Sequence, residues 1–333
     1  MDVRDVSTVY GRRQRPQNQL DLGRALPDSP ARKPVHADAI HYFNRYTQRV
    51  ETEQIYGEGV MRWIYGSLSG RLALHAVAKR AFFSRWYGWC MDRPASRAKV
   101  APFVQNFRVD TGEFADAPES FRTFNEFFYR KLKPTARPIA GDARTAVFPA
   151  DGRHLGFADV SRMDGIFVKG EVFSLGGLLQ DRELAERFQR GSMVLSRLCP
   201  VDYHRFHFPV AGLATEPRVL NGWLYSVSPI ALRRNIHIFT ENKRAITRIE
   251  SPEFGTVLML EVGATNVGSF EYTFPPNTRV AKGAEKGYFK FGGSSTITLF
   301  EPGRVKLDAD LLAHTAERRE LYARMGDRLG VAA

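Results

Sequence analysis

The sequence predicts an α+β fold in which a helical N-terminal part precedes a mostly antiparallel, β-rich core. Two observations lead to this prediction. Residues 37–138 carry apolar side chains at helical spacing, whereas residues 139–333 contain short β-prone runs separated by Gly, Pro and Asp. With 333 residues and 43% hydrophobic content, the chain can bury a sizeable core.

The composition is that of a globular protein with a strong basic bias. The formal net charge is +12 and the pI is about 9.8, which predicts an acidic partner such as nucleic acid or an anionic membrane surface. The two cysteines, Cys90 and Cys199, lack the spacing of a disulfide framework or a metal site. Charged or polar residues interrupt every apolar run, so neither a transmembrane helix nor a secretory signal is expected.

Residues 1–36 are polar and rich in Arg, Gln and Pro, with Arg12, Arg13 and Arg15 in a cluster. They show almost no periodic apolar pattern. We therefore expect a flexible basic tail.

The region 37–138 is expected to be helical, and the helical pattern begins near His36 and runs to about Met91. This first part combines aromatic with basic side chains. Trp63, Trp86 and Trp89 are interspersed with arginines and lysines. Such helices suit a membrane surface, where indole rings lie at headgroup depth and cations meet lipid phosphates. A helix whose aromatic face packs on the protein's own core has the same pattern, so both interpretations remain open.

Further along, Phe124, Phe127 and Phe128 would share one helical face, which predicts core packing. Within 139–333 we expect helices at 177–190 and 308–329. The β-prone runs are 147–156, 166–175, 193–198, 219–227, 236–239, 257–262 and 289–300.

The last of these runs, 289–300, contains an unusual turn. Apolar residues alternate on both sides of Gly292-Gly293-Ser294-Ser295, which predicts strand, turn and strand. Glycines permit backbone angles that side chains forbid, so a serine hydroxyl directly after them can approach the preceding carbonyl carbon for an N-to-O acyl shift. The same residues also form plain hairpin turns, which are far more common.

His204 and His207 lie close together among the eight histidines of the chain. Imidazole moves protons near neutral pH, so the pair is a candidate for acid–base chemistry. A metal site is an alternative, but no third ligand is evident because His154 is distant in sequence and Cys199 lies outside the usual spacing. Two structural histidines are the third interpretation.

Asp151 precedes Gly152, a position that is usually a turn. With His207 and Ser294 it would complete an Asp-His-Ser relay. In such a relay the carboxylate fixes the imidazole tautomer, the imidazole takes the serine proton, and the serine attacks.

Taken together, these residues resemble the phosphatidylserine decarboxylase family, from about His41 to Leu312. The matching pieces occur in the family's order, which chance does not produce. They are Tyr56-Gly57-Glu58, Arg62-Trp63-Ile64-Tyr65, Ser96-Arg97-Ala98-Lys99-Val100, Phe124-Asn125-Glu126-Phe127-Phe128, Ala136-Arg137-Pro138, Pro149-Ala150-Asp151-Gly152, Val168-Lys169-Gly170, Asp202-Tyr203-His204-Arg205-Phe206-His207, Val262-Gly263-Ala264, Val267-Gly268-Ser269 and Gly293-Ser294.

The sequence departs modestly from the family pattern at the junction. The family's Gly-Ser-Thr reads Gly293-Ser294-Ser295 here, so two serines compete for the scissile position. Aligning the following strand on Phe300 selects Ser294, which also has the glycine before it.

The resemblance implies a proenzyme that cuts itself between Gly293 and Ser294. Ser294 would be deprotonated by His207, with Asp151 behind it, and would become a covalent pyruvoyl group. That group would form a Schiff base with phosphatidylserine and accept the electrons released with CO2, giving phosphatidylethanolamine. His204 would protonate the resulting carbanion. No metal is implied.

The resemblance also implies partners and a location. The partners would be phosphatidylserine in an anionic membrane, the chain's own two cleavage fragments and a second copy in a homodimer, without nucleic acid. The protein would be peripheral, on the cytoplasmic face of the membrane. Alternatives are a pyruvoyl decarboxylase of a soluble amino acid, a lipid-binding homologue that does not cut itself, and a metal hydrolase that uses the two histidines.

Overall fold

The computed structural model describes residues 39–54, 57–67, 69–70, 81–163, 173–232, 237–264, 270–292 and 294–333, all within the unit Ala39–Ala333. The predicted tail, Gly293 and two pieces of the resemblance, 168–170 and 267–269, lie outside the described residues.

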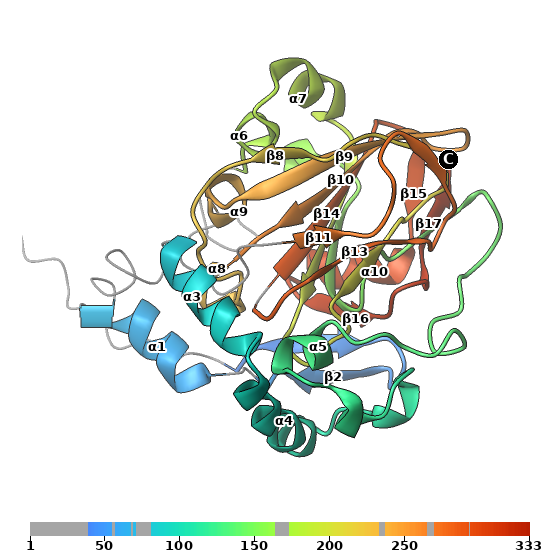
Figure 1. The fold of residues 1–333 in the computed structure, drawn as a ribbon. Coiled ribbons are helices and arrows are strands. Elements are labelled where there is room, and N and C mark those ends of the chain that lie inside the picture. The colour runs from blue at the N-terminus through green and yellow to red at the C-terminus, as the bar shows by residue number, and fades with distance from the viewer. Residues whose placement is uncertain are drawn as a thin grey trace, which may run out of the picture. The chain divides into compact units, whose positions relative to one another are not determined.

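A large sheet of eleven strands dominates the fold (Figure 1), in the order β12-β7-β9-β10-β14-β5-β4-β16-β1-β2, with β8 also paired to β9. Every described pair in it is antiparallel except β1 with β16. Its strands are β1 (His41–Asn44), β2 (Arg49–Thr52), β4 (Gly152–Phe157), β5 (Ser192–Leu198), β7 (Gly212–Ala214), β8 (Arg218–Leu220), β9 (Arg244–Ser251), β10 (Gly255–Val262), β12 (Thr278–Val280), β14 (Ser294–Phe300) and β16 (Glu320–Ala323).

Two three-stranded sheets accompany it, in the orders β11-β13-β6 and β15-β17-β3. Their strands are β3 (Thr145–Val147), β6 (Arg205–His207), β11 (Phe270–Tyr272), β13 (Glu285–Phe289), β15 (Val305–Leu307) and β17 (Arg328–Ala332). One hydrophobic cluster joins the small sheets to the large one, with Phe206, Phe289 and Leu329 packed together with Met259 and Phe300. The central strands β5 and β14 are therefore buried along their whole length.

The helices are short, and several begin at a side chain that caps the first turn. Thr123, Ser174 and Asp181 each accept a hydrogen bond from the backbone N–H three residues further along the chain. The helices are α1 (Glu58–Gly66), α3 (Ala81–Met91), α4 (Val100–Phe107), α5 (Phe124–Phe128), α6 (Leu175–Leu179), α7 (Arg182–Phe188), α8 (Pro229–Leu232), α9 (Ile238–Glu241) and α10 (Ala309–Ala316), with 3₁₀ turns η2 (Pro94–Lys99), η3 (Thr111–Glu113), η4 (Pro118–Ser120) and η5 (Val160–Arg162).

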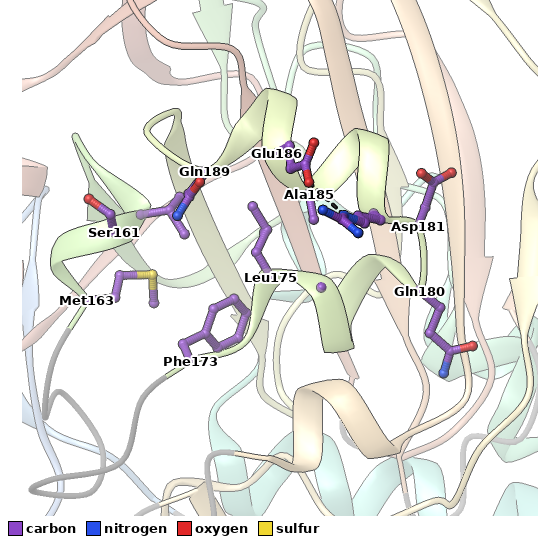
Figure 2. Close-up of a pocket in the computed structure, with 12 residues that line it drawn as sticks. Ser161, Met163, Phe173, Leu175, Gln180, Asp181, Ala185, Glu186 and Gln189 are labelled. Atoms are coloured by element: carbon purple, nitrogen blue, oxygen red, sulfur yellow. Dashed lines mark hydrogen bonds and ion pairs between the residues drawn. The ribbon is translucent and has the colours of Figure 1, made fainter. Parts of the chain in front are cut away.

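A cavity of about 520 Å³ lies between η5 and the α6–α7 pair (Figure 2). Its lining mixes apolar and polar side chains, including Met163, Phe173, Leu175, Asp181 and Glu186. The η5 wall is tied to Gly191, just before β5, by the Val160 N–H. Because β5 begins opposite Phe300 and ends opposite Ser294, this wall lies about 20 Å from the predicted cleavage junction.

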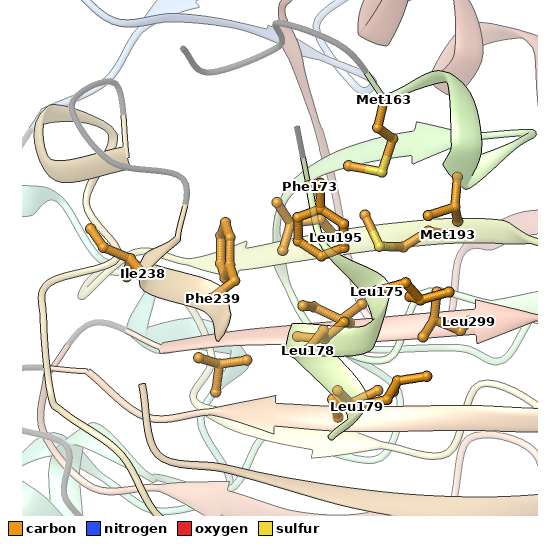
Figure 3. Close-up of a cluster of buried hydrophobic side chains, with 14 of the residues drawn as sticks. Met163, Phe173, Leu175, Leu178, Leu179, Met193, Leu195, Ile238, Phe239 and Leu299 are labelled. Atoms are coloured by element: carbon orange, nitrogen blue, oxygen red, sulfur yellow. The ribbon is translucent and has the colours of Figure 1, made fainter. Parts of the chain in front are cut away.

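Beneath the cavity, α6 packs on the large sheet (Figure 3). Leu175, Leu178 and Leu179 of this helix cover Leu195 of β5 and Leu299 of β14. All five are buried, and burial of each such side chain contributes roughly 1.5–3 kcal/mol. This cluster fixes the face of β14 that carries Ile297 and Leu299.

The predicted helix 177–190 is confirmed as α6 and α7, and the strands at 193–198 and 257–262 as β5 and β10. The shared face of Phe124, Phe127 and Phe128 is also confirmed, because all three are buried in one aromatic cluster. In the part of the chain that the structure describes, no helix is long and apolar enough to span a bilayer.

Other elements differ from the prediction. Residues 36–91 do not begin as a helix, because 41–44 and 49–52 form β1 and β2. The predicted helix 308–329 ends at Ala316, and β16 follows it. In both places the strands pair with partners far away in sequence, β1 with β16, a contact that local propensity does not encode.

The short apolar run 236–239 is the third difference, since Ile238–Glu241 forms a helix rather than a strand. Of the predicted strand 219–227, only residues 219 and 220 lie in a strand, as part of β8. The run 166–175 lies mostly outside the described residues, and α6 begins at its end. Apolar runs of this length fit either kind of element, so tertiary packing decides between them.

Candidate active site

The predicted cleavage stretch is not a hairpin. Strand β13, before the junction, pairs with β11 and β6 in a small sheet, whereas β14, after it, lies between β10 and β5 in the large sheet. The strand–turn–strand prediction is confirmed, but the turn carries the chain from one sheet to another. Gly292 has a φ of 144°, which side chains disfavour.

Ser294 is the first residue of β14, where it lies opposite Leu198 of β5. Its side chain is fully buried, and its Oγ has no hydrogen-bond partner among the described residues. Leaving a buried hydroxyl unpaired costs about 1–3 kcal/mol, so such groups mark strained or reactive positions. The nucleophile that the sequence predicts is therefore a buried hydroxyl without a hydrogen-bond partner in the described part of the chain.

The segment before the junction is held by groups from elsewhere in the chain. The Phe289 N–H donates to the His204 carbonyl at 2.9 Å, and the Phe291 N–H donates to Asn125 Oδ1 at 2.8 Å. The Phe291 ring packs edge-on against Phe124 and Phe128. These contacts place α5 directly against the junction.

His204 lies against the same segment. Its ring is 3.8 Å from the Phe128 ring, and its Nδ1 lies 3.1 Å from the Asp202 carbonyl, which accepts and so assigns the proton to Nδ1. Burial lowers the His204 pKa to about 3, although the backbones of Asp202 and Gly292 act in the opposite direction. At neutral pH His204 is therefore uncharged, and its Nε2 has no hydrogen-bond partner among the described residues by geometry.

A backbone carbonyl also orients His207, but here the carbonyl belongs to Gly283. Its Nδ1 lies 3.0 Å from the Gly283 carbonyl, and its buried Nε2 has no partner among the described residues. Burial lowers the His207 pKa, opposed by the Gly283 carbonyl and by the charges of Glu285 and Asp151. Both imidazoles are therefore oriented by backbone carbonyls, and both are neutral bases at pH 7.

Asp151 is close to His207 but is engaged elsewhere. Its oxygens accept from the Arg137 guanidinium at 2.6–3.1 Å and from the Met325 N–H at 2.8 Å. The His207 N–H donates to the Pro149 carbonyl at 2.7 Å, so the two segments run side by side. In the described part of the chain, no hydrogen bond joins Asp151 to His207, and the predicted relay is linked at this point only by the electrostatic effect of the carboxylate.

Sequence reasoning missed the buried ionic groups around these residues. Arg137, which the sequence shows only as part of the motif Ala136-Arg137-Pro138, forms an ion pair with Asp151. Arg153 pairs with Asp202, the residue whose carbonyl orients His204. Asp151 and Arg153 within the β-prone run 147–156 are the signal that the sequence offers, because a charge in a buried strand requires a partner. No group of His, Cys, Asp and Glu among the described residues is arranged to hold a metal ion.

A buried serine hydroxyl that follows a glycine pair, with a neutral imidazole packed against the same segment, is a candidate site for acyl transfer within the chain itself. The family model described as phosphatidylserine decarboxylase matches residues 124–331. The chain belongs to the phosphatidylserine decarboxylase family.

Relatives named phosphatidylserine decarboxylase proenzyme match most of the chain. The protein from Chlamydia muridarum is 46% identical over 289 residues, covering 87% of this chain and 96% of the relative. The one from Fusobacterium nucleatum is 42% identical over 296 residues, covering 89% and 99%. Among solved structures, glucose permease IIA from Mycoplasma capricolum aligns with 56% of this chain and 94% of its own at 14% identity, and its TM-score of 0.27 supports no conclusion.

Proposed function

We propose that this chain is a proenzyme that cuts itself between Gly293 and Ser294 and then decarboxylates phosphatidylserine to phosphatidylethanolamine and CO2. One observation carries the proposal beyond the family relationship. The Ser294 hydroxyl is fully buried and unpartnered among the described residues, directly after the glycine pair. A nucleophile for the preceding carbonyl needs to be at this position, and Ser295, which is buried in the same way, does not follow a glycine.

The cut begins when Ser294 Oγ loses its proton and attacks the Gly293 carbonyl carbon. The C–N bond then breaks and the amine takes a proton, which leaves an ester between the two residues. Removal of the Ser294 Cα proton expels the Gly293 carboxylate and leaves a dehydroalanine. Water converts this group to a pyruvoyl group and releases ammonia, so the second fragment begins at position 294.

We assign the first proton transfer to His207 Nε2, with Asp151 as the nearby charge that favours the imidazolium that forms. A base that starts neutral is suited to this step, and burial lowers the pKa of both histidines so that both are neutral at pH 7. Because Gly283 accepts from Nδ1, the lone pair of His207 lies on Nε2.

When formed, the pyruvoyl group supplies a ketone conjugated to an amide, which can take up a substrate amine and accept the electrons released with CO2. We assign His204 Nε2 to protonating the substrate carbon after CO2 leaves. An anionic substrate beside the ring raises the pKa of His204 above the value of about 3 in the empty site. Substrate binding thereby favours the protonated imidazole that this step needs.

We propose that α1 and α3 form the membrane-facing surface of a peripheral protein on the cytoplasmic face. Trp63, Trp86 and Trp89 are about half exposed on these two helices. Large exposed indoles beside arginine are suited to the headgroup layer, and the net charge of +12 favours an anionic bilayer.

The test is the intact mass of purified protein beside Ser294→Ala, with Ser295→Ala as the matched control. Ser295 is also buried and unpartnered among the described residues, so its loss removes a similar group without removing the nucleophile. We expect two fragments from the wild type and from Ser295→Ala, and one uncut chain from Ser294→Ala.

A second measurement identifies the substrate. Wild-type protein should release CO2 from phosphatidylserine in vesicles, not from free serine, and borohydride should abolish that activity. A wild-type chain that stays whole while releasing CO2 from the lipid would refute the proposal.

A further inference from the structure

We infer that Asn125 is a positioning residue for self-cleavage, a clamp that holds the backbone just before the scissile bond to the end of α3. This inference rests on the proposed function of the junction. It concerns a side chain that plays no part in the proton transfers assigned above.

The Asn125 side chain is fully buried, and its amide is engaged at both ends. Oδ1 accepts from the Phe291 N–H at 2.8 Å, while Nδ2 donates to Asp92 Oδ1 at 2.8 Å and lies 3.4 Å from the Gly88 carbonyl. An N–H on one side and two oxygen acceptors on the other leave only one orientation of the amide. The Asn125 side chain therefore holds the Phe291 backbone N–H in one position.

Phe291 needs this acceptor because the small sheet has already ended. The described ladder of β13 stops at Phe289, so the next backbone groups have no strand partner there. A buried N–H without a partner costs about as much as a lost hydrogen bond, and Asn125 supplies the missing acceptor. The Asn125 side chain thus supplies the hydrogen-bond acceptor that a neighbouring strand would otherwise provide.

The position of Phe291 matters because the other side of the junction is already fixed. Ser294 is in register with Leu198, and Ser295 with Val262, so the attacking residue is held by the large sheet. Attack requires the carbonyl of Gly293 to lie within reach of Ser294 Oγ, and a shift of about 1 Å can cost about a hundredfold in rate. Only two residues separate the clamped N–H from Ser294.

Asp92 provides the anchor of the clamp. It directly follows α3, its own N–H bonds to the Gly88 carbonyl at 3.0 Å, and its second oxygen lies 3.7 Å from Lys290 Nζ. Asp92 therefore holds the junction twice, through Asn125 and through Lys290. The clamp ties the cleavage segment to the helix that carries Trp86 and Trp89.

The experiment follows cleavage over time in freshly synthesised chains, with the folded fraction measured on the same samples. Asn125→Ala removes both hydrogen bonds, and we expect cleavage per folded molecule to slow by about tenfold or more. Phe121→Leu is the control for a general loss of packing, since Phe121 belongs to the same aromatic cluster and contacts Phe114 and Phe127. It should lose stability and still cut at the wild-type rate.

A polarity swap tests the clamp directly. Asn125→Asp keeps the acceptor for Phe291 but places two carboxylates together, so it should also cut slowly. Adding Asp92→Asn lets the new amide donate to the new carboxylate, and the double variant should cut several times faster than Asn125→Asp alone. This pair decides the question even if Asn125→Ala does not fold.

Two results would overturn the inference: folded Asn125→Ala that cuts at the wild-type rate, or a swap that cuts no faster than the single Asn125→Asp variant. Either result would leave the proposed function intact, provided that Ser294→Ala stays whole. If Ser294→Ala were itself cut, the proposed function would fail instead.

Discussion

The two sides of the cleavage junction are held in different ways. After the junction, β14 pairs with β5 over all seven of its residues and with β10 from Ser295 to Phe300, so backbone hydrogen bonds fix it. Before the junction, the chain has left β13, and side chains such as Asn125 and the ring of Phe128 hold it instead. A backbone ladder tolerates substitution, whereas side-chain contacts do not. Apart from the nucleophile Ser294, sensitivity of cleavage to mutation should therefore be concentrated on the glycine side, and both fragments should stay in place after the cut.

The largest expected effect concerns the two histidines. His207→Gln should slow self-cleavage by about 10² or more, because general bases contribute 10²–10⁴-fold. His204→Gln should still be cut, but the product should release little CO2 from phosphatidylserine. Fragment mass and CO2 release from the same preparations measure the two steps separately.

If His204→Gln blocked self-cleavage and His207→Gln did not, the two histidines would exchange their assigned roles. His204, whose carbonyl binds the glycine side through Phe289, would then be the base for cleavage.

A buried ion pair joins the two sides and provides the next test. Lys286 of β13 contacts Glu261 of β10 at 2.5 Å, and neither is exposed. Lys286→Met leaves the Glu261 carboxylate without its cation and should reduce the free energy of unfolding by about 3–5 kcal/mol. The double variant with Glu261→Leu should be close to the parent. Urea unfolding of the uncut Ser294→Ala chain measures this, and equal losses in single and double variants would show that the sides are not coupled through this pair.

The pH dependence of the free energy of unfolding tests His204, which contacts the segment before the junction. The His204 pKa is about 3 in the folded chain and about 6.5 when unfolded, so below pH 6.5 the unfolded chain binds the extra proton. The contribution of His204 to stability is complete above pH 6.5 and is lost as the pH falls toward 3. At pH 4.5 the loss is about 3 kcal/mol.

His204→Gln in the Ser294→Ala background should remove that part of the pH dependence. His154→Gln is the control on the other side, because His154 of β4 is also buried, with a pKa lowered to about 3 by burial. His154→Gln should remove a similar part of the pH dependence of stability. If the stability of the parent Ser294→Ala chain did not change between pH 7 and pH 4, both expectations would be wrong.

The smallest effect on cleavage is expected at the exposed indoles. Trp63→Ala with Trp89→Ala changes side chains that are about half exposed, so self-cleavage should be unchanged. Binding to vesicles containing anionic lipid should weaken several-fold, as measured by co-sedimentation, since each indole contributes to interfacial anchoring. Unchanged sedimentation would remove α1 and α3 from the proposed membrane surface.

The sequence by itself determined the chemically distinctive residues and the local elements. Ser294 after two glycines, His204 beside His207, and the buried face of Phe124, Phe127 and Phe128 all follow from short-range spacing, which a single chain displays directly. Helix 177–190 and the strands β5 and β10 were predictable for the same reason.

Only the tertiary structure decided what those residues touch. It paired β1 with β16, assigned β13 and β14 to separate sheets, bound Asp151 to Arg137 and gave Phe291 its acceptor in Asn125. These contacts join residues up to hundreds of positions apart, and their free energy comes from burial and from satisfying buried polar groups. Such requirements act on the assembled core, so they leave no periodic pattern in the sequence around any one residue.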